Sequence, residues 1–280
     1  MLELPEAVTL TRQMNDVLAG KVIASAKANT SPHKFAFYHG DPVGYAAKFA
    51  GQTLGRSRVH GSLIVTKIGT GHELLLGDGG LRVLFHESER TLPKKHQLLL
   101  RFTDDTALTV SVSGWGAVWL MTPEERSAHR WAGRDGVAPN TDAFTREFLE
   151  QQIATLPEGD KRSIKYFVIS DPKVFGVANG YLQDILFHAR LHPRRRAAAL
   201  ATDERTLLYG AIRSTIADAI AAGGRITERD LFNQRGRYTP LMYTKTKELP
   251  CTICGTPIKK ISYLGGSCYL CPTCQPLPEE

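Results

Sequence analysis

The stretch Ser170–Pro193, SDPKVFGVANGYLQDILFHARLHP, decides the fold predicted for the second half of the chain. Pro172 disfavours helical geometry at the residue before it, so a helix is expected to stop there. Gly176 and Gly180 can take positive φ in a compact turn, and Leu182–Ala189 then carries apolar residues at helical spacing. Such a turn exposes backbone N–H groups that suit a phosphate, although an ordinary helix–helix connection has the same pattern.

Size and composition set the class of protein. A chain of 280 residues predicts roughly two domains, and a hydrophobic content of 42% can support a core. Lys and Arg number 35 against 28 acids, which gives a net charge of +7 and mildly favours a polyanionic partner. No apolar run has membrane-spanning length, and the first residues are acidic where a signal peptide is basic. We therefore expect a soluble cytoplasmic protein without a membrane partner, associated with the nucleoid if it is bacterial.

The hydrophobic periodicity changes along the chain. A helix is expected over Ala7–Leu18, and the pattern from Lys34 to Met121 is mostly period two, which indicates an antiparallel sandwich or barrel. Residues 122–142 are polar and rich in Gly and Pro, as in a domain boundary. The predicted strands are Phe35–Tyr38, Leu63–Ile68, Leu74–Leu76, Leu81–Phe85, Leu98–Phe102 and Leu108–Val112.

Helical spacing follows the boundary. Apolar residues mark helices around Phe144–Ile153, over Ile164–Ile169 and in the opening stretch. A fourth helix has its cap at Thr202 or Asp203 and ends at Gly223-Gly224. The fold class predicted is therefore α+β multidomain. Its parts are an N-terminal antiparallel sandwich or barrel (residues 1–130), a helical domain (131–235) and a C-terminal four-cysteine segment (236–280).

Four cysteines give the most specific motif in the sequence. Cys251 and Cys254 form one Cys-x2-Cys pair, and Cys271 and Cys274 form a second, sixteen residues further on. Two such pairs supply four thiolates that can close a tetrahedron around one Zn²⁺, usually on a small hairpin. Because sulfur fills every position, the predicted zinc is structural. Cys268 lies outside the pattern and is expected to be a packed or free thiol.

Basic groups are spread over the chain. The intervening loop of the cysteine ribbon carries Lys259 and Lys260, which could meet a phosphate or simply face solvent. Further groups are Lys94-Lys95-His96, Lys161-Arg162 with Lys165, and Arg194–Arg196. Together with the glycine turn and the ribbon, they favour contacts to a nucleic-acid backbone.

Taken together, these stretches resemble the formamidopyrimidine-DNA glycosylase and endonuclease VIII family along nearly the whole chain. The matching pieces are ELPE at residues 3–6, GVANGY at 176–181, the HP that follows that helix, and CPTCQ at the end of the finger. The resemblance implies that the N-terminal part is a β-sandwich with flanking helices, followed by a helix–two-turn–helix domain and a C-terminal β-ribbon zinc finger. It also implies double-stranded DNA, damaged or abasic, as the partner of a monomer. It also implies that a damaged nucleotide is extruded from the duplex.

The resemblance also implies roles for single residues. Asn179 would contact the phosphate backbone near the lesion, within the DNA-binding turn that includes Gly180 and Tyr181. Glu3 would protonate or orient the sugar. The family nucleophile is a proline that follows the initiator methionine, where this chain has Leu2. Leucine is too large for the usual removal of Met1, and a Met1 amine would sit one residue from the family position, a displacement that costs about a hundredfold in rate.

Other family positions differ as well. The lysine of an early strand pair is absent from Arg58–Leu63, where His60 or Ser62 takes its place. In the family an arginine just before an aromatic–Gly pair fills the hole left by the flipped base. The corresponding segment here is Gly114-Trp115-Gly116, so the aromatic wedge is present as Trp115 and the arginine is absent. The methionine beside it corresponds to Asp78. The arginine of the finger loop falls within LGGS at 264–267, which contains no arginine.

Three hypotheses follow. The chain could be a DNA glycosylase, an N-glycosyl hydrolase with altered chemistry in which Glu3 activates water or the Met1 amine forms an imine. Schiff-base lyase activity is then not expected unless Met1 substitutes for the proline. It could instead be an inactive relative that senses damaged or distorted DNA. A zinc-ribbon protein that contacts only other proteins is the third hypothesis.

Overall fold

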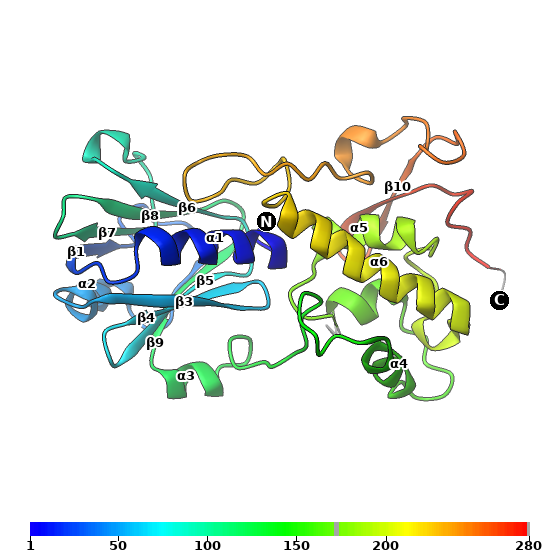
Figure 1. Ribbon diagram of the computed structural model, residues 1–280, viewed down its shortest axis with the longest axis horizontal. Helices are drawn as coiled ribbons and strands as arrows, with labels where there is room; N and C mark the ends of the chain where they lie inside the picture. Colours follow the sequence, from blue (N-terminus) through cyan, green and yellow to red (C-terminus); the bar gives the residue numbers. More distant parts are fainter. Residues whose placement is uncertain (171–173, 279–280) are drawn as a thin grey trace. The chain divides into compact units, whose positions relative to one another are not determined.

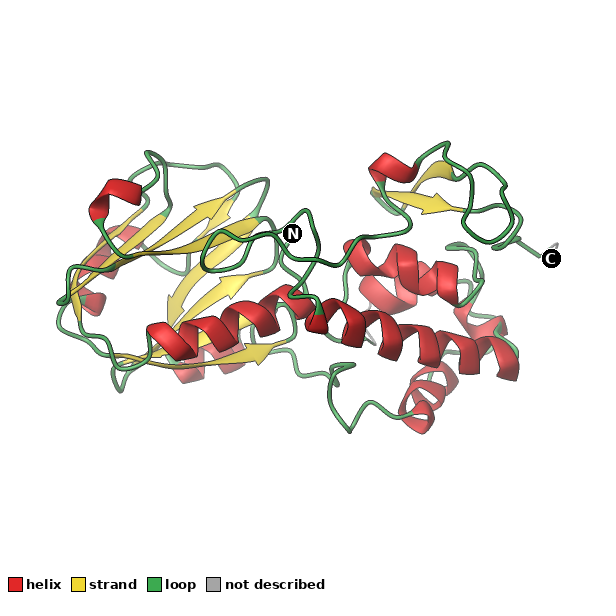
Figure 2. Ribbon diagram, turned by 45° about the horizontal axis from the view of Figure 1, so that its top comes forward, coloured by secondary structure: helices red, strands yellow, loops and turns green. Residues whose placement is uncertain are grey.

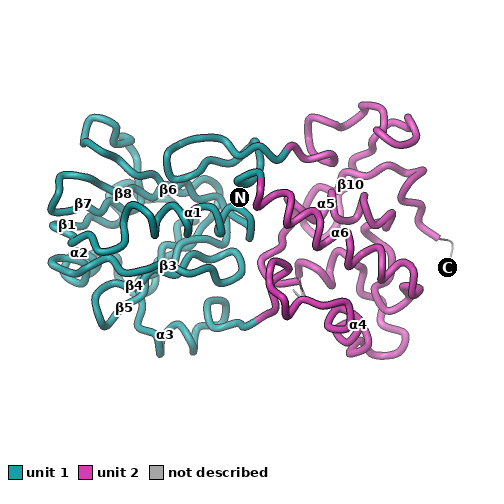
Figure 3. The backbone as a smooth tube through the Cα atoms, viewed as in Figure 1, with its two compact units in different colours: residues 1–135, 222–238 teal, residues 136–221, 239–280 magenta. Residues whose placement is uncertain are grey.

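The computed structural model describes residues 1–170 and 174–278, and the chain forms two compact units. Unit 1 comprises residues 1–135 and 222–238, and unit 2 comprises residues 136–221 and 239–280 (Figure 3). The predicted helix stop before Pro172 lies outside the described residues. The division into three domains remains a prediction.

Unit 1 is built from two sheets (Figures 1 and 2). The sheets are predominantly antiparallel, as predicted, except that the short β2 pairs in parallel with β9. The four-stranded sheet has the order β1 (Ile23–Ala28), β7 (Leu98–Phe102), β8 (Ala107–Val112) and β6 (Leu81–His86). The five-stranded sheet has the order β2 (Ala36–Phe37), β9 (Gly116–Met121), β5 (His72–Gly77), β4 (Leu63–Ile68) and β3 (Leu54–His60).

The core of unit 1 brings both sheets together with helix α1 (Leu4–Val17), which packs against β3. Leu10 and Met14 of α1 lie in this core with strand residues such as Leu76 and Leu100. Pro5 stands in the first turn of α1, where the missing N–H costs nothing. Burial of α1 therefore fixes the residues just before it, Met1 to Glu3.

Two shorter helices and a returning segment complete unit 1. Helix α2 (Tyr45–Phe49) packs against β1, and α3 (Pro123–Ala128) begins at a Thr122 capping box. Ala132 is buried against the outer face of the five-stranded sheet. Residues 222–238 follow a long helix of unit 2 and return to unit 1, where Leu231 joins the core.

Unit 2 is helical apart from one hairpin. Its helices are α4 (Arg146–Ala154), α5 (Asn179–His188) and α6 (Thr202–Ala221), with α6 packed against the other two. The predicted helix at Ile164–Ile169 is helical from Ile164 and continues as a π-helical turn, Tyr166–Ser170. Helix α6 ends before Gly223-Gly224, as predicted, and both glycines take positive φ.

The hairpin of β10 (Lys259–Tyr263) and β11 (Gly266–Leu270) packs against α5. A small core joins Phe187 of α5 to Tyr269, Ile258 and two cysteines. The buried Asp184 carboxylate of α5 accepts the N–H groups of Leu241 and Met242, with the Met242 bond at 2.8 Å. The ribbon is thus anchored by α5 within unit 2.

The fold class predicted from the sequence is confirmed, but three strands were missed. Strand β9 is buried at every position, so it lacks the alternation that reveals a half-exposed strand. Strands β1 and β3 contain short polar residues, and β3 carries arginines on exposed positions. Among the described residues, no helix has both the length and the apolar character needed to cross a membrane.

Candidate functional site

The amino terminus is held as a short extension of the sheet. The Leu2 N–H donates to the Gly79 carbonyl at 2.7 Å, and the Leu2 side chain is 4% exposed. Leu2 is thus fixed by a backbone bond and by burial. Its nitrogen is an amide, which has no basic lone pair with which to attack a sugar carbon.

Trp115 stands next to the same loop. The Trp115 carbonyl accepts the N–H of Gly80 at 2.8 Å, and the indole is 48% exposed. A Cβ on Gly79 would lie 2.0 Å from that carbonyl, so the close approach requires glycine. The loop therefore ties the amino terminus to an exposed aromatic side chain. Asp78 in this loop has a raised pKa because surrounding protein desolvates its carboxyl.

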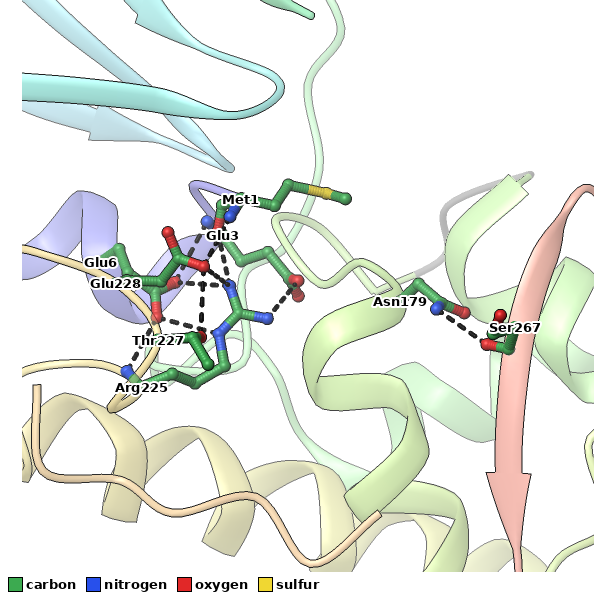
Figure 4. A network of polar contacts seen from close by, with 8 residues as sticks. All are labelled: Met1, Glu3, Glu6, Asn179, Arg225, Thr227, Glu228 and Ser267. Carbon is green, nitrogen blue, oxygen red and sulfur yellow. Dashed lines mark hydrogen bonds and ion pairs between the residues drawn. The ribbon is translucent and has the colours of Figure 1, made fainter. Parts of the chain in front are cut away.

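Glu3 lies in a buried charge cluster (Figure 4). Its carboxylate is 0% exposed and accepts a bond from Arg225 Nη1 at 2.9 Å. The same guanidinium donates to Glu6, from Nε at 3.3 Å, and to the Met1 carbonyl. A guanidinium carries only N–H donors and stays charged, so the Glu3 carboxylate is the acceptor in this bond. The sequence analysis gave no role to Arg225 or Glu6.

A glycine turn brings Arg225 into this position. Gly223 and Gly224 take φ values of +72° and +92°, which a side chain would strain. A Cβ on Gly224 would lie 3.0 Å from a Glu6 oxygen. The Arg225 N–H then donates to that Glu6 carboxylate at 3.1 Å. The glycine turn thus brings the backbone of Arg225 against Glu6, in the first turn of α1.

Met1 contributes an amine to the same region. The amine lies 2.7 Å from Glu228 Oε1, and the Thr227 hydroxyl approaches that oxygen at 3.3 Å (Figure 4). Met1 and Glu228 also line a cavity of about 650 Å³ in unit 1, together with basic residues such as Arg82 and Lys95. The amine therefore borders a space that a reactant could enter, whereas Glu3 is buried.

His60 ends β3 in the hairpin that replaces the expected lysine motif. Burial lowers the pKa of its imidazole, and the nearby charges of Arg58 and Arg126 lower it further. The ring is therefore mostly neutral at pH 7 and would meet a phosphate by a neutral hydrogen bond.

The glycine turn of unit 2 meets the finger. The Asn179 side-chain amide donates to the Ser267 carbonyl at 3.1 Å, and Gln183 donates to the same oxygen at 2.7 Å. Gly176 takes φ +84°, whereas Gly180 is helical in the first turn of α5. The Tyr181 side chain is fully buried, and the place of this residue in the DNA-binding turn remains a prediction.

A buried lysine reaches the tip of the finger. Lys165 is 1% exposed, and its ammonium donates to the Tyr263 carbonyl at 2.8 Å. It also lies 3.4 Å from the Cys268 sulfur, and Cys268 is packed in the interior. A Cβ on Gly266 would lie 3.3 Å from this ammonium. Lys165 thus lies beside Gly266 in the finger loop, whose LGGS segment at 264–267 contains no arginine.

Four cysteines gather at the base of the finger. The sulfur atoms of Cys251, Cys254, Cys271 and Cys274 all lie within 4.8 Å of one another. Three of the separations are 3.8, 3.4 and 3.5 Å. A tetrahedron with metal–sulfur bonds of about 2.3 Å has sulfur atoms about 3.8 Å apart, so the cluster fits a metal ion. The exposed Lys259 and Lys260 lie on β10 without an ion-pair partner among the described residues.

Two of the residues that sequence reasoning missed, Arg225 and Glu228, act at long range, whereas Glu6 lies three positions from Glu3. Arg225 lies 222 positions from Glu3, and Glu228 lies 227 positions from Met1. No local periodicity joins them. The only signal was the pair of glycines before Arg225, which marked a helix end.

The β-sandwich, the helical unit and the cysteine ribbon define the class of DNA glycosylases with a helix–two-turn–helix domain. The chain belongs to the formamidopyrimidine-DNA glycosylase and endonuclease VIII family. Residues 136–230 match the family model described as the formamidopyrimidine-DNA glycosylase H2TH domain. A formamidopyrimidine-DNA glycosylase of Gluconobacter oxydans is 30% identical over 98% of this chain and 100% of its own length. That of Bacillus subtilis is 28% identical over 98% and 99%.

Solved structures agree on the fold. The Lactococcus lactis Fpg protein in complex with DNA that contains an abasic site superposes with a TM-score of 0.83, at 22% identity over 98% of this chain and 99% of that one. Its complex with DNA containing Fapy-dG gives 0.84, with 98% and 100% covered. The scaffold predicted from the sequence is therefore confirmed.

Proposed function

We propose that the protein is a damaged-DNA-binding protein of base-excision repair in which the glycosylase chemistry is altered or weakened. The observation that carries the proposal is the state of Leu2. Its nitrogen is an amide bonded to the Gly79 carbonyl and its side chain is buried. An amine nucleophile at this position is therefore replaced by a structural contact.

Several features support duplex DNA as the partner. The net charge is +7, and Lys259 and Lys260 extend from the finger into solvent. Trp115 presents an indole that could stack against exposed bases. The Lactococcus lactis relative was solved with DNA containing an abasic site. Damaged or abasic duplex is thus the substrate class we propose, contacted by the Asn179 turn.

The cysteine cluster would hold one Zn²⁺ with a structural role. Four thiolates leave no coordination position for water, so the ion would not activate a nucleophile. The sulfur separations fit this ion, and bound zinc would fix the base of the hairpin. The finger residues in turn place the Ser267 carbonyl against Asn179.

A second function, an inactive sensor of damaged DNA, is favoured by the charge cluster. Glu3 is bonded to Arg225, and the Met1 amine is paired with Glu228. Both groups that could replace the missing proline are therefore already engaged. A sensor would need the scaffold and its contacts to DNA but no reaction.

One set of assays separates these functions. We would measure binding to duplexes that contain an abasic site, an oxidised pyrimidine or no damage, over a range of salt concentrations, and then measure base release. Preferential binding to damage, with affinity that falls steeply with salt, is the expected result. Slow base release that is lost in Glu3→Gln would support the glycosylase. Damage-specific binding without release would support the sensor.

Binding that ignores both DNA damage and ionic strength would refute both functions. A matched control for Glu3→Gln is Glu87→Gln, which alters an exposed carboxylate after β6. If the control also loses base release, the effect of Glu3→Gln is not specific to the charge cluster.

A further inference from the structure

The charge cluster of unit 1 joins the amino terminus to residues 225–228 in two ways. Arg225 binds the residues at the start of the chain, and Glu228 binds the Met1 amine. Arg225 is 5% exposed and binds the Met1 carbonyl, Glu3 and Glu6. Of these contacts, the bond to the Met1 carbonyl holds the first peptide group. The inference below rests on the proposed function because it concerns the same group of residues.

Glu228 is the partner of the Met1 amine itself. Their separation is 2.7 Å, whereas Arg225 Nη2 lies 3.9 Å from the same Glu228 oxygen. The Met1 and Glu228 side chains are 34% and 23% exposed, so this pair lies at the surface of the cluster. The carboxylate thus attracts the protonated amine more directly than it attracts the guanidinium.

The ion pair has a chemical consequence. A protonated amine has no lone pair, so it cannot add to a carbonyl carbon until the proton leaves. The free amine adds to an aldehyde as the N–C bond forms and the C=O π bond breaks. The resulting carbinolamine loses water and leaves an imine. A carboxylate that stabilises the ammonium therefore slows the first step of this sequence.

We propose that Glu228 restrains the Met1 amine and thereby sets its reactivity toward aldehydes, including the C1′ aldehyde of an abasic sugar. Arg225 acts as the positioning residue that holds the Met1 peptide group beside Glu228. The cavity that both Met1 and Glu228 line gives an aldehyde access to this amine. Removal of the Glu228 charge, with the Arg225 contacts kept, releases the amine for imine formation.

Reductive methylation tests the proposal without DNA. The full-length protein is treated with formaldehyde and cyanoborohydride, whose hydride reduces the imine to a methylamine, and methylation of the Met1 peptide is followed by mass spectrometry. Intact mass first establishes that the Met1 amine is free. Glu228→Gln should be methylated at Met1 about threefold to tenfold faster than the wild type, with exposed lysines as the internal reference. Glu228→Asp should restore slow methylation.

The exposed Glu87→Gln serves as the matched control and should leave the Met1 rate unchanged. An unchanged or slower Met1 rate in Glu228→Gln overturns the proposal, as does an equal increase in the control. Borohydride trapping on an abasic duplex forms a second arm, in which Glu228→Gln should increase the trapped fraction. If no variant binds the duplex, the proposed function fails while the methylation result still decides the role of Glu228.

Discussion

The amino-terminal cluster of unit 1 and the finger anchor of unit 2 are both buried polar networks, but they are built differently. The finger is attached to α5 mainly by neutral side chains that bind backbone groups, as when Gln183 binds Ser267 and Tyr269. The amino terminus is fixed by full charges, with Arg225 between two buried glutamates.

The two kinds of network have different consequences for a reaction. Hydrogen bonds to backbone groups define a geometry and add no reactive group. Buried ion pairs engage the carboxylates that a reaction would need, and a pair that loses one partner is costly. In unit 2 the polar network holds the finger in place, whereas in unit 1 the carboxylates of Glu3 and Glu6 are paired with Arg225.

Metal removal should have the largest effect, and it should be confined to unit 2. Chelation is expected to unfold roughly the last forty residues, because structural zinc in small fingers contributes on the order of 10 kcal/mol. Hydrogen exchange followed by mass spectrometry would show lost protection in residues 251–274, while α1 stays protected. Retained protection after complete removal of the metal, or pure protein that contains no metal, would break the contrast between the regions.

Arg225→Gln tests the charged network of unit 1. It leaves Glu3 and Glu6 buried without their cation, so we expect the free energy of unfolding to fall by about 3–5 kcal/mol in chemical denaturation. The control Arg229→Gln removes a bond from a less buried arginine to the Asn233 carbonyl and should cost less than about 1 kcal/mol. Equal losses of unfolding free energy in the two variants would show that the buried ion pairs of Arg225 contribute no more than one exposed hydrogen bond.

Asp184→Asn tests the anchor in unit 2, where one buried carboxylate receives two backbone N–H groups. An amide retains a single acceptor oxygen, so a loss of about 1–3 kcal/mol is expected, with faster exchange near Met242. The exposed Asp218→Asn on α6 should stay within about 0.5 kcal/mol of the wild type. A loss larger than that of Arg225→Gln would reverse the proposed ranking of the two regions.

The smallest effect concerns pH. His86 is buried between the Thr91 and Thr109 hydroxyls, and burial lowers the pKa of its ring. The unfolded chain then takes up the proton first, so stability falls as pH drops below about 6.5, by at most about 1.4 kcal/mol per pH unit. Urea titrations between pH 8 and 5 should show a shallower slope in His86→Gln. The exposed His188→Gln should keep the slope of the wild type.

The sequence predicted the scaffold because its signals are local. The spacing of Cys251, Cys254, Cys271 and Cys274 was sufficient to predict the cluster that the structure contains. Gly223-Gly224 marked the end of α6 correctly. Strand β9 was not predicted because a strand buried on both faces has no alternating pattern.

The ion pairs at the amino terminus could not be predicted from the sequence. Leu2 differs from the proline that the resemblance implies, but nothing near it in the chain pointed to Arg225. Their proximity depends on the return of residues 222–238 to unit 1, which is a property of the tertiary fold. The burial of the Tyr181 side chain likewise depends on the tertiary fold, and its place in the DNA-binding turn remains a prediction.

The most direct measurement compares binding and covalent capture on the same abasic duplex. The bound fraction and the borohydride-trapped fraction would be measured at each protein concentration in one titration. With the DNA scaffold kept and the reactive groups held in ion pairs, we predict saturable binding with a trapped fraction at least about tenfold below the bound fraction. A trapped fraction that equals the bound fraction at every concentration would contradict the account.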